Sequence, residues 1–202
     1  MSKYFYAVKE GRQKGIYNTW QECEAQVKGY PAAIFKKFSS YEDALKFING
    51  HKEEVREVDI SNLEENEMVA YVDGSFDKAS GYYSYGVILF TKDGRCHISK
   101  KEKDENMNSM RNVAGEIRGA MVAMEKALEE KKDTLYLYYD YMGIEKWATG
   151  EWKANKYGTK MYKNYYDSIK DSLRVVFKKV VAHSGNKYNE EADKLAKKAL
   201  DK

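Results

Sequence analysis

Four acidic residues lie far apart in the sequence, and each falls beside an apolar segment that should belong to a core. They are Asp73, Glu116, Asp140 and Asp193. An unpaired carboxylate at the edge of a core costs free energy unless a positive charge compensates it. Carboxylates and water are the ligands that Mg²⁺ and Mn²⁺ prefer, and two such ions about 4 Å apart can stabilise the attacking and leaving oxygens of a phosphoryl transfer. The residue types therefore predict metal-assisted phosphoryl-transfer chemistry.

Each acid taken alone has a simpler explanation. An aspartate at the end of a strand is usually a turn or cap residue, and a glutamate on an amphipathic helix usually faces water. The hypothesis depends on the four acids occurring together on four separate elements, so it depends on where those elements lie.

The hydrophobic pattern of the C-terminal two thirds predicts alternating strands and helices. Apolar residues on both faces of "MVAYVDGSF" predict a buried strand that ends at Asp73, and Asp93-Gly94 is a strong hairpin signal. Asn189 is expected to cap the last helix. This order of elements predicts an α/β fold with a mixed five-stranded sheet flanked by helices. Strands are expected at about 68–76, 82–91, 95–100, 133–140 and 174–183, and helices at about 109–130, 141–149, 158–172 and 189–200.

The charge of the 202-residue chain is unevenly distributed, although its formal net charge is only +3. Residues 1–50 carry eight basic and five acidic residues, residues 51–67 carry two and seven, and residues 68–202 carry 25 and 20. Two mildly basic bodies are thus separated by an acidic stretch. We expect domains at 1–50 and 68–202, joined by an acidic linker at 51–67. A basic body alone is weak support for a polyanionic partner.

The first body, residues 1–50, is too short to hold a large core. Its pattern predicts a strand, a tight turn, a strand, a helix, a strand and a helix. Thr19 and Glu22 have the spacing of a capping box at the first helix. The segment contains no convergent set of acids and no metal-ligand cluster. We therefore expect a small three-stranded α/β module that binds a partner and does no chemistry.

Four motifs in residues 68–202 occur in the order seen in the type 1 ribonuclease H family, which this part of the chain resembles. "YVDGSF" is similar to the family's first strand, "NVAGEIRGAMVAMEKAL" to its glutamate-bearing helix, and "LYLYYDYMGIEKW" to the strand with the second aspartate. In "VVAHSGNKYNEEADKLAKKA", His183 precedes Asp193 by ten residues, as in the family. The resemblance covers nearly all of residues 68–202 and implies the ribonuclease H fold.

The resemblance also implies a mechanism. The four acids would hold two Mg²⁺ ions, or Mn²⁺, and the enzyme would hydrolyse the RNA strand of an RNA/DNA hybrid to 5′-phosphate and 3′-hydroxyl ends. His183 would assist proton transfer or product release. Asn112, with the close-packing Gly115, would lie at the RNA minor groove, where 2′-hydroxyls distinguish RNA from DNA. Val113 departs from the family, which often has a second polar residue there.

A basic stretch interleaved with aromatic residues lies between the last two acids. Residues 152–179 hold eight basic and two acidic residues. Lysines close to aromatic rings suit a nucleic-acid strand whose phosphates and sugars are both held. The resemblance places the groove for the DNA strand here, with Trp147 and Trp152 at the nucleic acid, although packing in the core is the simpler role for such rings.

Residues 4–49 resemble the hybrid-binding, or viroplasmin-like, domain at the N-terminus of many type 1 ribonucleases H. The similar segments are "FYAV", "GIYNTWQEC" and "QVKGYPAAIFKKF". In that family aromatic side chains pack on DNA sugars, while lysines and backbone amides hold the phosphates and the RNA. The resemblance therefore places five residues at an RNA/DNA hybrid, namely Tyr6, Trp20, Phe35, Lys36 and Lys37.

Two other functional classes stay open. The chain could be another nuclease on the same fold, or a non-catalytic hybrid-binding protein, which the presence of all four acids disfavours. The sequence contains no run of 18 apolar residues and no apolar signal region. Cys23 and Cys96 lack metal-like spacing, so we expect free thiols in a cytoplasmic protein. We expect a monomer that requires neither a membrane nor a protein partner.

Overall fold

The computed structural model describes residues 4–49, 58–181 and 185–201. The chain divides into two compact units, residues 1–56 and 57–202. No helix among the described residues is both long enough and apolar enough to cross a membrane.

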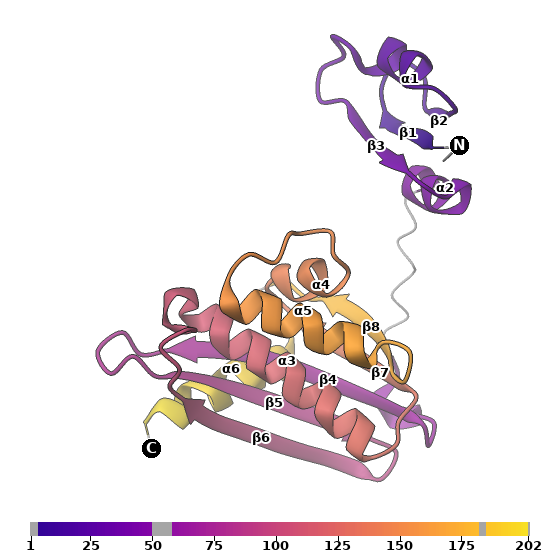
Figure 1. The fold of residues 1–202 in the computed structure, drawn as a ribbon. Helices are drawn as coiled ribbons and strands as arrows, with labels where there is room; N and C mark the ends of the chain where they lie inside the picture. Colours follow the sequence, from indigo (N-terminus) through magenta and orange to yellow (C-terminus); the bar gives the residue numbers. More distant parts are fainter. Residues whose placement is uncertain (1–3, 50–57, 182–184, 202) are drawn as a thin grey trace. The chain divides into compact units, whose positions relative to one another are not determined.

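The first unit is a three-stranded antiparallel sheet between two helices (Figure 1). Val8 packs toward the first helix and Ala7 toward the second, so the alternation of one strand supplies two small cores. The capping box of Thr19 and Glu22 is present, and the expected order of elements is confirmed. The elements are β1 (Phe5–Glu10), β2 (Gly15–Tyr17), α1 (Trp20–Val27), β3 (Ile34–Phe38) and α2 (Tyr41–Asn49), with strand order β2-β1-β3.

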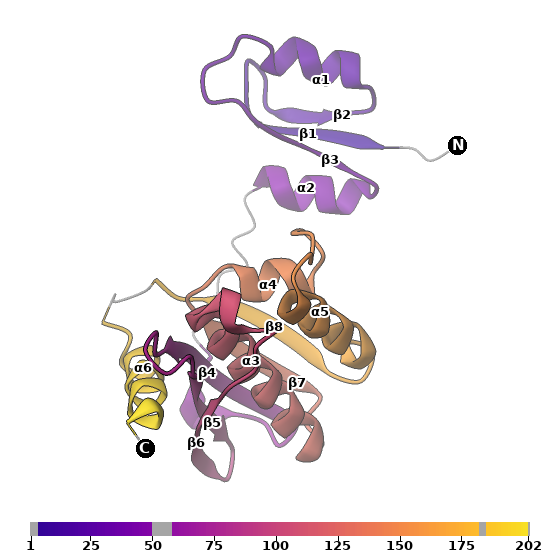
Figure 2. The same cartoon turned by 60° about the vertical axis from the view of Figure 1, so that its left-hand side comes forward.

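The second unit is a mixed five-stranded sheet with helices on both faces, as the sequence predicts (Figures 1 and 2). Its elements are β4 (Glu67–Phe76), β5 (Tyr83–Thr91), β6 (Gly94–Glu102), α3 (Asn112–Glu129), β7 (Thr134–Tyr139), α4 (Gly143–Ala148), α5 (Tyr157–Ile169), β8 (Arg174–Lys179) and α6 (Lys187–Leu200), with 3₁₀ turns at Ile60–Asn62 and Asn108–Met110. The strand order is β6-β5-β4-β7-β8. Strand β4 pairs antiparallel with β5 and parallel with β7. Helix α6 covers one face of the sheet, and α3 lies on the other (Figure 2).

Strand β4 is buried on both faces because its alternate residues meet different helices. Met68, Ala70 and Val72 belong to the core that α3 closes, whereas Val69 and Tyr71 belong to the core beneath α6. The buried strand inferred from the two-sided apolar pattern is therefore confirmed. Both helices can reach the C-terminal half of β4. Asp73, the first of the four predicted site acids, stands there.

Glycines let both helices approach the sheet backbone at this point. A Cβ on Gly115 of α3 would lie 2.0 Å from the carbonyl oxygen of Ser84, and one on Gly74 would lie 2.4 Å from the backbone N of Glu116. On the opposite face, a Cβ on Gly86 would lie 2.1 Å from the carbonyl oxygen of Ala192 in α6. No side chain other than hydrogen fits at these three contacts, so they fix the depth at which α3 and α6 lie on the sheet.

Several boundaries differ by a few residues from the sequence prediction, and two of these differences have a clear physical reason. The last helix is capped by Asn186, whose side-chain oxygen accepts from the N–H of Asn189 at 3.1 Å, so the expectation that Asn189 is the cap is wrong. The helix gains its extra residues because Tyr188 packs against the sheet. In the β5–β6 hairpin Gly94 already pairs with Thr91. The turn therefore falls one residue earlier than the Asp93-Gly94 signal suggests.

The described part of the acidic stretch packs against the second unit. Val58, Ile60 and Leu63 join the core beneath α6, and Leu63 is buried there. The division of the chain at residue 56 follows from these contacts. These apolar residues lie between acidic ones, so a count of charges describes the whole stretch as acidic. The count does not reveal that part of the stretch packs against the sheet.

The close approach of α3 can be tested with two alanine substitutions on one helix. We expect Gly115→Ala to lower the free energy of unfolding by about 1–3 kcal/mol or more, because its methyl group collides with backbone that cannot move aside. Gly119→Ala, one turn later, places its Cβ at an ordinary 3.4 Å from its neighbours. It should be neutral or stabilise by up to about 1 kcal/mol through helix propensity. Urea unfolding of both variants measures this, and equal effects would contradict the proposed contact.

Candidate active site

Two aspartates lie where the pairing between two parallel strands ends. Strands β4 and β7 pair as far as Tyr71 and Tyr138, and β4 then continues to Phe76 paired only with β5. Asp73 stands just beyond this point on β4, and Asp140 directly follows β7. Asp73 therefore lies within its strand and not at the strand's end. The two carboxylates emerge at the same edge of the sheet, where open α/β sheets usually bind ligands.

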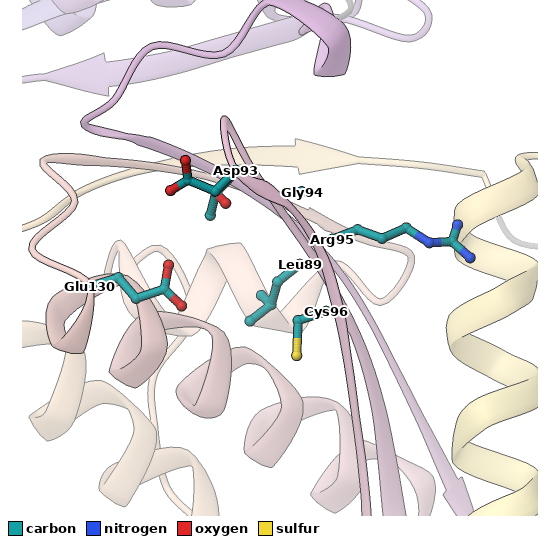
Figure 3. A pocket seen from close by; sticks show the side chains of 7 residues that line it. Leu89, Asp93, Gly94, Arg95, Cys96 and Glu130 are labelled. Carbon is teal, nitrogen blue, oxygen red and sulfur yellow. The ribbon is translucent and has the colours of Figure 1, made fainter.

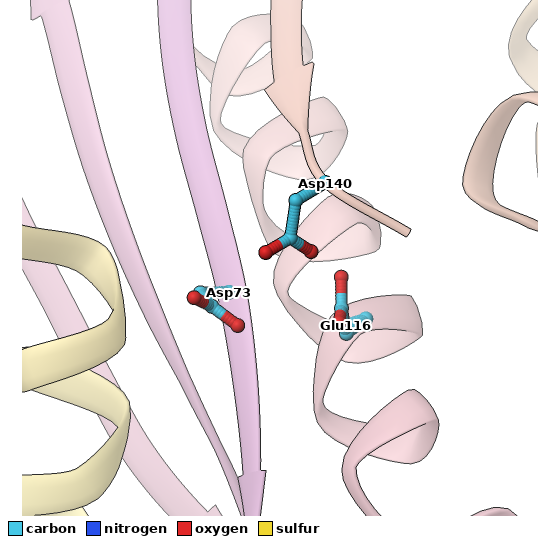
Figure 4. A group of neighbouring side chains, drawn as sticks. All are labelled: Asp73, Glu116 and Asp140. Atoms are coloured by element: carbon cyan, nitrogen blue, oxygen red, sulfur yellow. The ribbon is translucent and has the colours of Figure 1, made fainter. Parts of the chain in front are cut away.

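Helix α3 brings a third carboxylate to the same place. Glu116 follows Gly115, the residue that lets α3 lie against the backbone of β5. One oxygen from each of Asp73, Glu116 and Asp140 lies within 4.8 Å of the other two. The three side chains point toward one another from β4, α3 and the end of β7 (Figure 4). Three of the four acids predicted from the sequence thus form one cluster.

Burial makes this cluster costly without a cation. Asp73 is 8% exposed and Glu116 only 3%. Asp73 Oδ1 accepts a hydrogen bond of 2.7 Å from the N–H of Gly74. Glu116 Oε2 is buried and, within the described residues, has no hydrogen-bond partner. A buried carboxylate oxygen without a partner is rare in proteins, and a divalent cation held by oxygen ligands would satisfy it. The donor set therefore fits Mg²⁺ or Mn²⁺.

The electrostatics of the cluster also favour a bound cation. Burial, with the charge of Asp140 as the second cause, raises the pKa of Asp73 to about 7. Burial and the charges of Asp140 and Asp73 also raise the pKa of Glu116 well above its ordinary value. Both shifts mean that the protein disfavours the negative charges that it gathers here. A bound cation would reverse that preference.

The fourth acid lies in the same cavity but outside the cluster of three. The cavity has a volume of ≈ 350 Å³, and Asp193 of α6 lines it together with the three clustered acids. The carboxylate of Asp193 accepts from Lys197 Nζ at 2.7 Å, one helical turn away. Lys197 was not predicted from the sequence, although its i,i+4 spacing from Asp193 was a readable signal. Its ammonium group also lowers the pKa of Asp73, partly opposing the burial.

Gly74, Asn112 and Tyr141 complete the lining of the cavity. Asn112, the first residue of α3, lines it beside the acids, and its predicted contact with the RNA minor groove stays a prediction. Tyr141, which the sequence did not single out, follows Asp140. His183, predicted to assist the chemistry, lies outside the described residues.

An adjacent hollow contains one of the two predicted tryptophans. Trp147 lines it together with Tyr141 and Lys156, and part of its ring packs against the main core. Trp152 stands edge-on to Trp147, with ring centroids 6.0 Å apart, and is 41% exposed. Tyr141 lines both hollows, so the tryptophan pair and the carboxylates share one continuous surface.

The predicted binding residues of the first unit largely share one face. The rings of Tyr6 and Trp20 lie 5.8 Å apart, as do those of Trp20 and Phe35. Trp20 and Phe35 are each 43% exposed. Tyr6 pairs with Lys37 in the β1–β3 register, so Phe35 and Lys37 belong to the same face by strand alternation. Lys36 belongs to the other face of β3. The described residues of this unit contain no cluster of acids able to hold a metal ion.

A third hollow lies at the β5–β6 turn, at the far end of the sheet from the acids (Figure 3). Arg95 points away from it toward α6, where its guanidinium pairs with Glu191 at 3.4 Å. The remaining charged groups at this hollow are the carboxylates of Asp93 and Glu130. A pocket of that charge is unsuited to a polyanion, and it plays no part in the site described above.

Comparisons with known proteins agree with this geometry. The family model described as RNase H matches residues 65–201, and the one described as ribonuclease H1 N-terminal domain matches residues 4–48. Human ribonuclease H1 is 28% identical over 253 residues, covering 96% of this chain and 88% of that protein. Ribonuclease H of Francisella philomiragia is 36% identical over 146 residues, covering 67% and 91%. The crystal structure of RNase H1 from Halobacterium salinarum superimposes with a TM-score of 0.56 at 24% identity, covering 67% and 98%.

The electrostatic cost of the cluster predicts a stability gain on neutralising it. Because the pKa of Asp73 is higher in the folded state than in the unfolded state, its charge destabilises the fold as the pH rises from about 4, fully so above about 7. Asp73→Asn in metal-free buffer should therefore raise the free energy of unfolding at pH 8, on the order of 1–3 kcal/mol, and change it little at pH 4.

Asp167→Asn is the control for this prediction. Lys163 donates a side-chain hydrogen bond to Asp167 and lowers its pKa, so neutralising this half-buried acid should not stabilise the fold at pH 8. Urea unfolding with a chelator at the two pH values measures both variants. A destabilised Asp73→Asn protein at pH 8 would show that the cluster is compensated without a cation.

Proposed function

This chain belongs to the ribonuclease H family, and from that premise we propose that it hydrolyses the RNA strand of RNA/DNA hybrids. The observation that carries the proposal is the cluster of Asp73, Glu116 and Asp140 within 4.8 Å, with one buried glutamate oxygen that has no hydrogen-bond partner among the described residues. Such a site favours a bound cation, and pairs of cations held by carboxylates are one established means by which proteins cleave phosphodiesters. The match of the N-terminal model to residues 4–48 supports the hybrid as the substrate.

Asp73, Glu116, Asp140 and Asp193 would hold two Mg²⁺ ions, with Mn²⁺ as a substitute. When bound, these ions would supply an activated water as nucleophile and charge stabilisation for the leaving 3′-oxygen, so that the products carry 5′-phosphate and 3′-hydroxyl ends. The chain's own contribution is to hold the ligands in place. The N–H of Gly74 fixes the orientation of Asp73, and Lys197 holds Asp193 at the side of the cavity. His183 would assist proton transfer or product release.

The residues around the carboxylates would recognise the two strands differently. Asn112, at the rim of the cavity, is placed to contact 2′-hydroxyls and base edges in the minor groove of the hybrid. Trp147, Trp152 and Lys156 would contact the DNA strand, because an aromatic surface with a lysine beside it suits a sugar–phosphate backbone. Selection of RNA for cutting would then depend on which strand lies over the carboxylates.

The first unit would anchor the enzyme on a hybrid. Its row of Tyr6, Trp20 and Phe35 offers exposed ring surface, and Lys37 supplies positive charge on the same face. Lys36, on the other face of the edge strand β3, would reach an adjacent phosphate. Linking two binding modules raises the effective concentration of the second on the same ligand. The unit should therefore lower KM on long hybrids without affecting the chemical step.

The nuclease activity is tested with one isosteric substitution. Asp140→Asn should abolish cutting of end-labelled RNA in a hybrid with Mg²⁺ or Mn²⁺, by about 10³-fold or more, because a neutral amide cannot replace a charged ligand between two cations. Single-stranded and duplex RNA should not be cut by the wild-type protein.

The exposed Asp171→Asn serves as the matched control and should retain wild-type rates. A wild-type protein that binds hybrid but cuts it with neither metal would make the chain a binding protein with an unused nuclease fold.

The anchoring role is tested in the full chain. The Trp20→Ala/Phe35→Ala double variant should raise KM on a long hybrid by about tenfold, because each ring stacking on nucleic acid contributes about 1–3 kcal/mol and the second unit still binds alone. The value of kcat should not change. Tyr41→Ala removes another exposed ring of the same unit, 54% accessible on α2, and should leave KM unchanged. An equal rise in KM for both variants would point to unfolding of the unit.

A further inference from the structure

A pair of lysines shares one aromatic ring at the turn between β4 and β5. Lys101 Nζ and Lys103 Nζ each lie 5.3 Å from the centroid of the Tyr82 ring. Neither ammonium group has a carboxylate partner within 4.0 Å among the described residues. We define the KYK surface as Tyr82, Lys101 and Lys103. Two like charges held beside one ring repel each other, and an anion bound between them would offset that repulsion.

The strand register places the KYK surface on the face of the sheet that α6 covers. Lys101 pairs with Ser84, whose Oγ donates to the carbonyl of Ala196 in α6 at 2.6 Å. Tyr82 directly precedes β5, and alternation continued by one residue puts it on the same face as Ser84. Helix α6 crosses this face with Ala192 against Gly86 and Ala196 near Ser84, so it runs along β5 toward Tyr82.

The same register gives the separation from the carboxylates. Ser75 of β4, Ser84 of β5 and Lys101 of β6 lie at one level of the sheet, and Ser75 is two residues beyond Asp73. With about 3.4 Å per residue along a strand and about 4.8 Å between strands, the Cα atoms of Asp73 and Lys101 are roughly 12 Å apart. A nucleic-acid strand covers that distance in a few nucleotides.

Lys197, which is paired with Asp193, lies on α6 between the two places. Lys197 reaches into the carboxylate cavity from α6, and it directly follows Ala196, the residue bonded to Ser84. Beyond it along the sheet lie Lys101 and then Lys103. The views agree that the β4–β5 turn and the C-terminal half of α6 lie at the same end of the unit (Figures 1 and 2). The tryptophan hollow lies instead beside α3 and α4, on the other side of the carboxylates.

From these contacts we propose that the KYK surface binds phosphates of the RNA strand a few nucleotides from the cut. The inference rests on the proposed function, because it takes the strand over the carboxylates to be RNA. That strand leaves the cavity past Lys197, while the DNA strand would lie toward the tryptophans. The Tyr82 ring holds both ammonium groups in place before the substrate arrives, which reduces the conformational entropy lost on binding.

Edge strands also carry lysines for a different reason. Strand β6 is an edge strand, and lysines on such a strand discourage pairing with another chain. That role requires no aromatic ring beneath the charges and no alignment with the active site. It predicts a change in aggregation on substitution and none in substrate binding, so the two roles are separable by experiment.

The test compares two double variants of the full chain that each lose two positive charges. In Lys101→Ala/Lys103→Ala, KM for an end-labelled hybrid of about 20 base pairs should rise about 5–20-fold at moderate salt, with kcat within twofold of wild type. The slope of log affinity against log salt, measured in an Asp140→Asn background, should become shallower by about 1.5 because two phosphate contacts are lost.

The control variant is Lys92→Ala/Lys126→Ala. Both lysines stand at the opposite end of the sheet, in the β5–β6 turn and in the last turn of α3, where they pair with Glu65 and Glu129. This variant should bind and cut within twofold of wild type. An equal rise in KM in the two double variants would show that the effect depends only on the net charge of the protein, and it would overturn the proposal.

Tyr82 is tested separately. Tyr82→Phe keeps the ring and should match wild type, whereas Tyr82→Leu should raise KM by about two- to fivefold because the lysines lose the aromatic face that holds them. No difference between the phenylalanine and leucine variants would remove the ring from the proposal.

Hybrids shortened from each RNA end separate this inference from the proposed function. Shortening on the side of the KYK surface should raise the wild-type KM and remove the difference between wild type and Lys101→Ala/Lys103→Ala. Shortening on the other side should leave that difference intact. A double variant with wild-type KM and salt slope would overturn the KYK surface while leaving the nuclease function in place. A wild-type protein that never cuts would overturn the function itself.

Discussion

The site depends on the approach of two helices to a strand backbone at positions without side chains. Helix α3 meets β4 and β5 at Gly74 and Gly115, and α6 meets β5 at Gly86. A methyl group at any of these contacts would overlap backbone atoms. Because Glu116 directly follows Gly115, the same contact that packs the helix also sets the distance between its carboxylate and Asp73. Packing and ligand geometry are therefore one constraint in this protein.

That constraint has an electrostatic consequence. The packing buries the carboxylates of Asp73 and Glu116, which raises the pKa of both. It also leaves one glutamate oxygen without a hydrogen-bond partner in the part of the chain that the structure describes. The fold accepts this cost because burial of both faces of β4 stabilises the sheet independently of the acids. A site that destabilises the empty protein is one that binds cations strongly, since the cation relieves the repulsion.

In the proposed function, the two units would divide recognition and chemistry between them. The first unit has two small cores around one sheet and presents Trp20 and Phe35 to solvent, which suits binding to a sugar–phosphate backbone. The second unit carries the carboxylates, with aromatic and basic groups on either side of them. Its anchored segment around Leu63 extends the core beneath α6.

The sequence by itself determined the order of elements, the buried strand β4 and the identity of the acids, because these follow from local periodicity and from motif order. It could not determine that Asp193 pairs with Lys197 apart from the other three acids, that Asn186 caps the last helix, or that Lys101 and Lys103 share the Tyr82 ring. Those facts depend on strand register and helix depth, which bring together residues far apart in the chain. Periodicity reports which face a residue occupies, and only tertiary packing decides which groups meet there.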